Sequence, residues 1–184
     1  MAFHDTNPTI TYDSTSAKYH IKYDGKTIVT TITDKAAVAE EWVNEILLLH
    51  ANTPTMVVGL DVEWRPHAIS YMSNKSATLQ LCIDSSTPSI EVDEDIKKLK
   101  NEYGLDCAKS ADIREVAKKK WPGRFRRPGL KDLASEVAGI HMKKPKHVCM
   151  SNWEARVLNE SQVEYACVDA YASYKIAYKL FFSD

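Results

Sequence analysis

MVVGLDVEW, residues 56–64, is a short apolar run interrupted by two acids, Asp61 and Glu63. A run of this kind is typical of a buried central strand whose far end opens into a site. The two acids lie at positions i and i+2, so both carboxylates point from the same face of the strand. Pro66 follows and ends the strand. We therefore predict a buried strand that carries a pair of carboxylates near its end.

The segments on either side of this strand predict further β-structure. Downstream, ATLQLCID at 77–84 alternates apolar and polar residues, and we expect it to be the hairpin partner of 56–64. Upstream, KYHIKYDGKTIVTTIT at 18–33 alternates around Asp24 and Gly25, which predicts an N-terminal β-hairpin.

Apolar residues elsewhere recur at the spacing of helices. We predict helices over 34–50, 95–104 and 130–139 and from 161 to the end of the chain, and a helix or a strand entering one over 111–120. Asp34 is expected to cap the first helix, and Ser161 with Glu164 to form a capping box at the last. Gly104 and Gly139 are expected to end the second and third. This order of elements predicts an α/β or α+β domain.

Length and composition predict one globular unit. The chain has 184 residues, of which 44% are apolar and 27% charged, enough for one core. We interpret 18–184 as a single domain and the polar, patternless 1–17 as a disordered tail. The sequence pattern supports neither a membrane span nor a secretory signal, and we expect an intracellular protein, nuclear or cytoplasmic. Four cysteines without CxxC spacing are expected to be reduced: Cys82, Cys107, Cys149 and Cys167.

Three more residues extend the acid pair into a candidate catalytic cluster. Tyr165 and Asp169 lie at i and i+4 of the predicted last helix, hence on one face, and Asp95 stands at a helix start. Adjacent carboxylates repel unless a cation neutralises them, and hard oxygen ligands suit Mg²⁺ or Mn²⁺. Acids that hold metal beside a tyrosine are typical of phosphodiester hydrolysis. The alternative is that Asp95 only caps its helix and Tyr165 is a core aromatic.

Positive charge is concentrated in one part of the chain. Between Arg114 and Lys146, eleven Lys and Arg face three acids, a net charge of +8; since the whole chain carries −1, the remainder carries −9. Such a stripe would hold a polyanion near carboxylates, and the alternative is a solvated surface. The candidate nucleic-acid-binding residues are Lys118, Lys119, Lys120, Arg124, Arg126, Arg127 and, for stacking on a terminal base or sugar, Trp64.

Several segments together resemble the Werner syndrome-like 3′-5′ exonucleases, and the plant branch is the most similar. The resemblance is carried by Asp61 to Trp64, LQLC at 79–82, DIKKLKNEYGL at 95–105, RPGLKDLA at 127–134 and SNWEARVLNESQVEYACVDAYASYKI at 151–176. These proteins form the tyrosine subclass of the DEDD superfamily. Their ribonuclease H-like (DnaQ-type) fold implies a mixed central sheet flanked by helices.

The resemblance assigns roles to the acid cluster. It implies that two Mg²⁺ or Mn²⁺ ions are bound by Asp61, Glu63, Asp95 and Asp169 and that Tyr165 orients the attacking water. It implies removal of nucleotides from a free 3′ end as nucleoside 5′-monophosphates. It also implies DNA or RNA as binding partner, with a helicase as a further partner.

One connection departs from the family. Ten residues at 85–94 stand where the family has two strands and a helix, and ten residues cannot form them. Either the chain lacks these strands, or residues around 85–90 are missing from this sequence. SIEV at 89–92 resembles the remnant of the last of these strands. Asp93 competes with Asp95 for the ligand position.

Three functions remain open from the sequence. The first is a metal-dependent 3′-5′ exonuclease acting on DNA. The second is a ribonuclease D-like exonuclease acting on RNA, because the acids do not distinguish the sugars. The third is a catalytically weak nucleic-acid-binding module that lost the geometry of Asp95 through the short connection.

Overall fold

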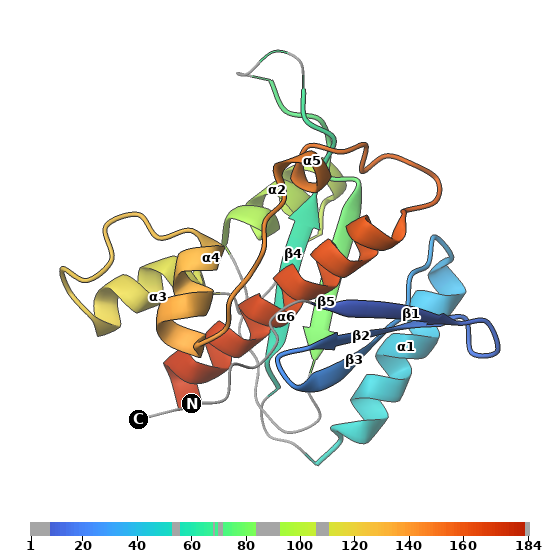
Figure 1. The fold of residues 1–184 in the computed structure, drawn as a ribbon, viewed down its shortest axis with the longest axis horizontal. Helices are drawn as coiled ribbons and strands as arrows, with labels where there is room; N and C mark the ends of the chain where they lie inside the picture. Colours follow the sequence, from blue (N-terminus) through green and yellow to red (C-terminus); the bar gives the residue numbers. More distant parts are fainter. Residues whose placement is uncertain are drawn as a thin grey trace.

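The computed structural model describes residues 8–52, 56–67, 69, 72–83, 93–105 and 111–182, with the backbone alone for 93–96. A long C-terminal helix, α6 (Glu160–Phe182), lies across two central strands (Figure 1). A small N-terminal sheet lies to one side of α6 and several shorter helices lie to the other (Figure 1). This is the α/β architecture that the sequence predicts.

The two central strands form an antiparallel pair. β4 (Val58–Glu63) and β5 (Thr78–Ile83) pair with Asp61 opposite Gln80, so the predicted hairpin partners are confirmed. The expected strand remnant at 89–92 lies outside the described residues. Within the described part of the chain, the expected mixed sheet is therefore represented by this antiparallel pair.

The predicted N-terminal hairpin is also present. β2 (Lys18–Tyr23) and β3 (Lys26–Thr30) pair antiparallel across Asp24 and Gly25. Both turn residues have positive φ, 51° and 70°. A two-residue type I′ turn requires this conformation at both positions, and Asp-Gly is among the sequences that adopt it most readily.

The prediction that residues 1–17 form a disordered tail is wrong for one segment. β1 (Thr9–Asp13) pairs antiparallel with β2 and extends the hairpin to three strands. Ile10 lies opposite Ile21, and the rings of Tyr12 and Tyr19 are 4.8 Å apart. Cross-strand contacts of this kind stabilise a strand whose own sequence carries only two apolar residues. Residues 1–7 lie outside the described residues.

The remaining helices largely follow the predicted pattern. They are α1 (Ala36–Leu49), α2 (Asp93–Tyr103), α3 (Ile113–Lys120), α4 (Leu130–Leu133), the π-helical turn η1 (Ala134–Ala138) and α5 (Lys146–Cys149). Gly104 and Gly139 both have φ of +71°, and they follow α2 and η1 as predicted. The segment 111–120, for which the sequence left a helix or a strand open, contains the helix α3. The short α5 was not predicted.

Two predicted helix caps are wrong. Lys35, not Asp34, is the N-cap of α1, and it makes no side-chain capping bond. At α6 the reciprocal cap is formed by Asn159 and Gln162 instead of Ser161 and Glu164. Asn159 Oδ1 accepts from the backbone N–H of Gln162 at 3.0 Å, and Gln162 Oε1 accepts from that of Asn159 at 3.1 Å. Gln162 also donates to the oxygens of Ser151 and Asn152, which fixes this register.

α6 is the centre of the hydrophobic core. Its residues Val163, Ala172 and Ile176 are buried in one cluster together with Ile21 of β2 and Leu133 of α4. The N-terminal sheet, β4 and the shorter helices are therefore assembled around one helix. Among the described residues, no helix combines the length and apolar character that a membrane crossing needs.

Candidate active site

Three of the predicted acids meet between β4 and α6. Oxygen atoms of Asp61, Glu63 and Asp169 all lie within 4.8 Å of one another. Alternation along β4 brings the first two to one face, and α6 packs across β4 to supply the third. Three carboxylates this close are the oxygen donors that Mg²⁺ and Mn²⁺ prefer, so the residues present fit a divalent metal.

Asp169 is the most buried member of this acid cluster. The residue is 1% exposed. Burial raises the pKa of its carboxyl, while the charge of Lys144 and hydrogen bonds from Lys144 and Tyr165 act in the opposite direction. Asp169 is therefore a buried carboxylate with two specific partners.

Lys144 is a site residue that the sequence analysis missed. It was counted there only among the basic residues between Arg114 and Lys146, because nothing in the spacing of a loop lysine connects it to Asp169, which lies 25 residues later. In the structure its ammonium group hydrogen-bonds Asp169 Oδ2 and lies 5.2 Å from the centre of the Tyr165 ring. Burial lowers the pKa of Lys144, but Asp169, Asp61 and Glu63 outweigh burial and raise it.

Tyr165 lies one helical turn before Asp169 on α6. The residue is buried, and its ring centre is 5.8 Å from that of Trp153. Burial and the charge of Asp169 raise the pKa of its hydroxyl, so the group is a neutral hydrogen-bond donor at neutral pH. Trp153 is held in turn by a bond from its Nε1 to the carbonyl of Cys149, 3.2 Å. Trp153 of the SNW segment at 151–153 thus packs against the ring of Tyr165.

The side chain of Asp95 lies outside the described residues, although its backbone belongs to α2. α2 packs Leu99 against Leu60 and Val62 of β4. Figure 1 places α2 beside the end of β4 that carries Glu63. The helix of the fourth predicted ligand is therefore near the cluster of three acids.

Trp64 directly follows the acid pair. It is half-buried against Leu60, Val62 and Leu99. The Lys98 ammonium lies 5.0 Å from the centre of its ring. Trp64 therefore has a packing role in addition to any contact with a ligand.

The predicted basic residues lie on α3 and in the connection to α4. Lys118 pairs with Glu115 at 2.6 Å, Lys120 donates to the carbonyl of Leu180 at 3.2 Å, and Arg124 pairs with Glu136 at 2.8 Å. Within the described part of the chain, the other three make neither an ion pair nor a side-chain hydrogen bond: Lys119, Arg126 and Arg127.

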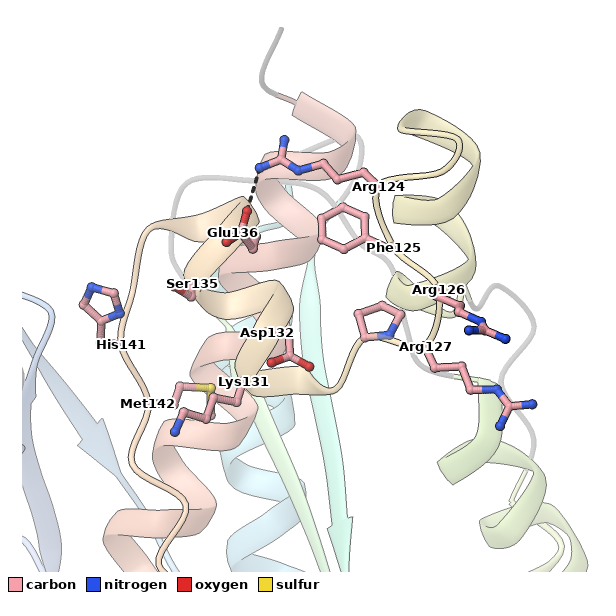
Figure 2. Close-up of a pocket in the computed structure, with 11 residues that line it drawn as sticks. Arg124, Phe125, Arg126, Arg127, Lys131, Asp132, Ser135, Glu136, His141 and Met142 are labelled. Atoms are coloured by element: carbon pink, nitrogen blue, oxygen red, sulfur yellow. Dashed lines mark hydrogen bonds and ion pairs between the residues drawn. The ribbon is translucent and has the colours of Figure 1, made fainter.

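A cavity of about 620 Å³ opens beside this connection. Figure 2 shows Phe125 facing the π-helical turn η1, with Arg126 and Arg127 pointing outward from the rim. Lys131, His141 and Met142 lie along its other side. Met142 is two residues from Lys144, so the segment that lines this cavity also leads to the acid cluster.

Comparisons with known proteins agree with this geometry. A family model described as 3′-5′ exonuclease matches residues 89–181. A 3′-5′ exonuclease of Arabidopsis thaliana is 30% identical over 146 residues, covering 65% of this chain and 50% of that protein. The bifunctional 3′-5′ exonuclease/ATP-dependent helicase WRN of Mus musculus is 26% identical over 157 residues, covering 67% of this chain and 11% of that protein.

A solved structure has the same fold. RNase D of Escherichia coli matches with a TM-score of 0.56 at 21% identity, covering 75% of this chain and 42% of that chain. The fold is thus ribonuclease H-like, and it holds the acid cluster between β4 and α6. The chain belongs to the 3′-5′ exonuclease family, a class of hydrolases. It spans about half the length, or less, of the curated relatives that it matches.

Proposed function

We propose that this chain is a metal-dependent 3′-5′ exonuclease that hydrolyses terminal phosphodiester bonds and releases nucleoside 5′-monophosphates. The observation that carries the proposal is the meeting of Asp61, Glu63 and Asp169 within 4.8 Å, one helical turn from Tyr165. Membership of the 3′-5′ exonuclease family supports the polarity of the reaction.

Each member of the cluster receives a role. Asp61, Glu63 and Asp169, with Asp95 from α2, hold two Mg²⁺ or Mn²⁺ ions. Bound metal supplies the positive charge that favours a hydroxide nucleophile and an anionic leaving oxygen. Tyr165 hydrogen-bonds the attacking water and fixes its direction, and on this role we propose membership of the tyrosine subclass. Its support by Trp153 keeps the hydroxyl in one position.

The substrate strand is held by its phosphates. Lys119, Arg126 and Arg127 make no ion pair within the described residues and are the first candidates for phosphate contacts. Lys118, Lys120 and Arg124 add positive charge while keeping their protein partners. Trp64 presents its exposed edge to the terminal base or sugar.

We propose DNA as the preferred substrate. RNA is the second candidate, because the fold is shared with RNase D of Escherichia coli, an exoribonuclease involved in structured RNA processing. The acids act on the phosphodiester in either case, and only contacts at the 2′ position distinguish the sugars. A catalytically weak binding module is the third outcome.

The cellular setting is proposed from the thiols and from one relative. The described cysteines, Cys82, Cys149 and Cys167, form no disulfide, as is usual in a reducing compartment, and we place the protein in the nucleus or cytoplasm. The mouse relative combines exonuclease and helicase in its name, which supports a helicase as partner.

The test uses DNA and RNA oligonucleotides that are labelled at either end. Each strand is incubated with the protein in Mg²⁺, Mn²⁺ or EDTA, and products are resolved by length. We expect stepwise loss of the 3′ label only with metal, and none with Asp61→Asn or Asp169→Asn. Glu41→Gln, an exposed acid on α1, is the matched control and should cut like the parent. Cutting by Asp61→Asn and Asp169→Asn at the parent rate would contradict the proposal, and binding without cutting would support the module.

The domain assignment has a separate test. We propose that 18–184, together with β1, form one exonuclease domain with residues missing around 85–90. The intact mass of the natural protein would then exceed the 20.8 kDa of this sequence. A mass equal to that value would show that the short connection is real.

A further inference from the structure

The ammonium group of Lys144 contacts the acid cluster at Asp169. Lys144 Nζ donates a hydrogen bond to Asp169 Oδ2. The carboxylate of Asp169 also has an oxygen within 4.8 Å of carboxylate oxygens of Asp61 and Glu63. The same ammonium lies over the ring of Tyr165, 5.2 Å from its centre. One lysine therefore contacts both functional groups of α6.

This contact differs from the ion pairs on the surface. Arg65 and Glu154 are 3.8 Å apart, and their side chains are 57% and 47% exposed, which leaves them mostly solvated. The side chain of Asp169 is only 2% exposed, and that of Lys144 is 30% exposed. A buried carboxylate without a counter-charge destabilises a fold strongly, so this lysine satisfies a requirement of the folded chain.

The backbone on either side of Lys144 is anchored. Tyr23 donates its hydroxyl to the carbonyl of His141 at 2.9 Å, and Met142 is buried in the main core. On the other side, Val148 of α5 is buried in one cluster with Trp153 and Tyr165. The anchoring delivers the lysine stem to the cluster, while the long side chain itself can turn away without moving the backbone.

A divalent cation and this ammonium cannot both keep their full contacts. Each is attracted to the same carboxylate oxygens, and two cations within a few ångströms of one another repel. We propose that Lys144 is the resident counter-cation of the metal-free site, and that it leaves Asp169 when a divalent metal binds. The inference rests on the proposed function, because it requires that the acid cluster takes metal. Lys144 is thus a positioning residue that stabilises the empty site and lowers its affinity for metal.

The experiment measures Mn²⁺ binding by calorimetry and thermal unfolding of the same proteins in EDTA and in Mn²⁺. Lys144→Met keeps the length of the side chain and removes the charge. Lys144→Arg restores the charge, and Lys143→Met removes a charge from the exposed neighbouring position.

We expect Lys144→Met to bind Mn²⁺ about tenfold more tightly than the parent, because the metal no longer displaces a cation. In EDTA the thermal unfolding midpoint of Lys144→Met should lie about 4 °C or more below that of the parent. Adding Mn²⁺ should raise this midpoint by more than it raises the midpoint of the parent. Lys144→Arg and Lys143→Met should bind Mn²⁺ like the parent, within about a factor of two.

Two results would overturn the inference, and they are distinguishable. Equal Mn²⁺ affinity in the parent and in Lys144→Met would show that the lysine does not compete, while leaving the metal-dependent function intact. No Mn²⁺ binding by either protein would overturn the proposed function together with this inference. Tighter binding by Lys143→Met as well would reduce the effect to general surface charge and would also contradict the specific role of Lys144.

Discussion

A methyl group on Gly59 would lie 2.2 Å from the carbonyl oxygen of Ala170. β4 and α6 therefore touch through backbone atoms at the level of the acid cluster, two residues from Asp61 and one from Asp169. The same methyl group would meet the backbone nitrogen of Tyr174 at 2.5 Å. No rotation of a side chain relieves these contacts, so the spacing of the three acids depends on glycine at this position.

Gly59→Ala should therefore destabilise the protein and separate the acids. We expect a loss of about 3 kcal/mol in the free energy of unfolding, because α6 must move away from β4. Urea denaturation measures the loss. Gly129→Ala is the matched control, since a methyl group there meets only Asp132 Oδ2 at 3.5 Å, and it should change stability by less than about 0.5 kcal/mol. Similar stability of the two variants would show that β4 and α6 are not in backbone contact.

Tyr165→Phe should separate metal binding from hydrolysis. The hydroxyl is removed while the ring keeps its contact with Trp153. We expect the rate of nucleotide release to fall by about a hundredfold, as when one group that positions a reacting proton is lost. Mn²⁺ affinity, measured by calorimetry, should stay within about a factor of two of the parent. A parallel loss of metal affinity would instead make Tyr165 a structural support of Asp169.

Arg126→Ala combined with Arg127→Ala should weaken binding of single-stranded DNA. Each lost phosphate contact lowers the slope of log affinity against log salt by about 0.7 for single strands. Fluorescence anisotropy at several salt concentrations measures this slope. The control pair is Lys22→Ala with Lys35→Ala, which removes two exposed charges at the N-terminal side of the molecule. Equal slopes for the two double variants would mean that only overall charge matters.

Asp112 makes part of the stability depend on pH. It caps α3 by accepting from the backbone N–H of Arg114 at 2.8 Å, and it pairs with the guanidinium of the same residue at 2.9 Å. Burial raises the pKa of Asp112, but the hydrogen bonds and charge of Arg114 outweigh burial and hold it below the ordinary value of 3.8. A carboxyl with a lowered folded-state pKa stabilises the fold above its unfolded pKa and loses this effect as the pH falls through its folded pKa.

Asp112→Ala should therefore cost about 1 kcal/mol at pH 7, the usual effect of losing an N-cap. The difference from the parent should shrink as the pH falls below about 4. Asp112→Asn keeps the acceptor oxygen without the charge, so its stability at pH 7 should lie between that of the parent and that of Asp112→Ala. Denaturation from pH 3 to pH 7 measures all three proteins. A difference that is constant over this range would show that the charge of Asp112 has no part in it.

The features that were predictable from the sequence depend on local repeats. Alternation placed Asp61 and Glu63 on one face of β4, and the spacing of one helical turn placed Tyr165 and Asp169 together on α6. The readiness of Asp-Gly to adopt positive φ predicted the turn at Asp24 and Gly25. These are short-range properties of the chain, and they were sufficient for the framework of the candidate site.

The features that were missed depend on partners distant in sequence. β1 is stabilised by its pairing with β2, where Ile10 and Tyr12 lie opposite apolar partners. Its own sequence has no pattern that would predict a strand. At the start of α6, Asn159 with Gln162 replaces the predicted capping box of Ser161 with Glu164, because Gln162 also bonds the loop at Ser151. Lys144 reaches Asp169 from a loop, where no periodicity predicts the direction of a side chain.

Tyr165 and Asp169 share one helix, and this has a consequence for how the site can vary. Their separation is set by the helical repeat, so the two groups move as one rigid body. Asp61 and Glu63 are likewise fixed to each other by β4. The spacing between these two pairs therefore has a single adjustable dimension, the gap between strand and helix, and Gly59 sets that gap at its minimum. Substitutions that tune this site should act by widening one interface, and the internal geometry of each half should survive them.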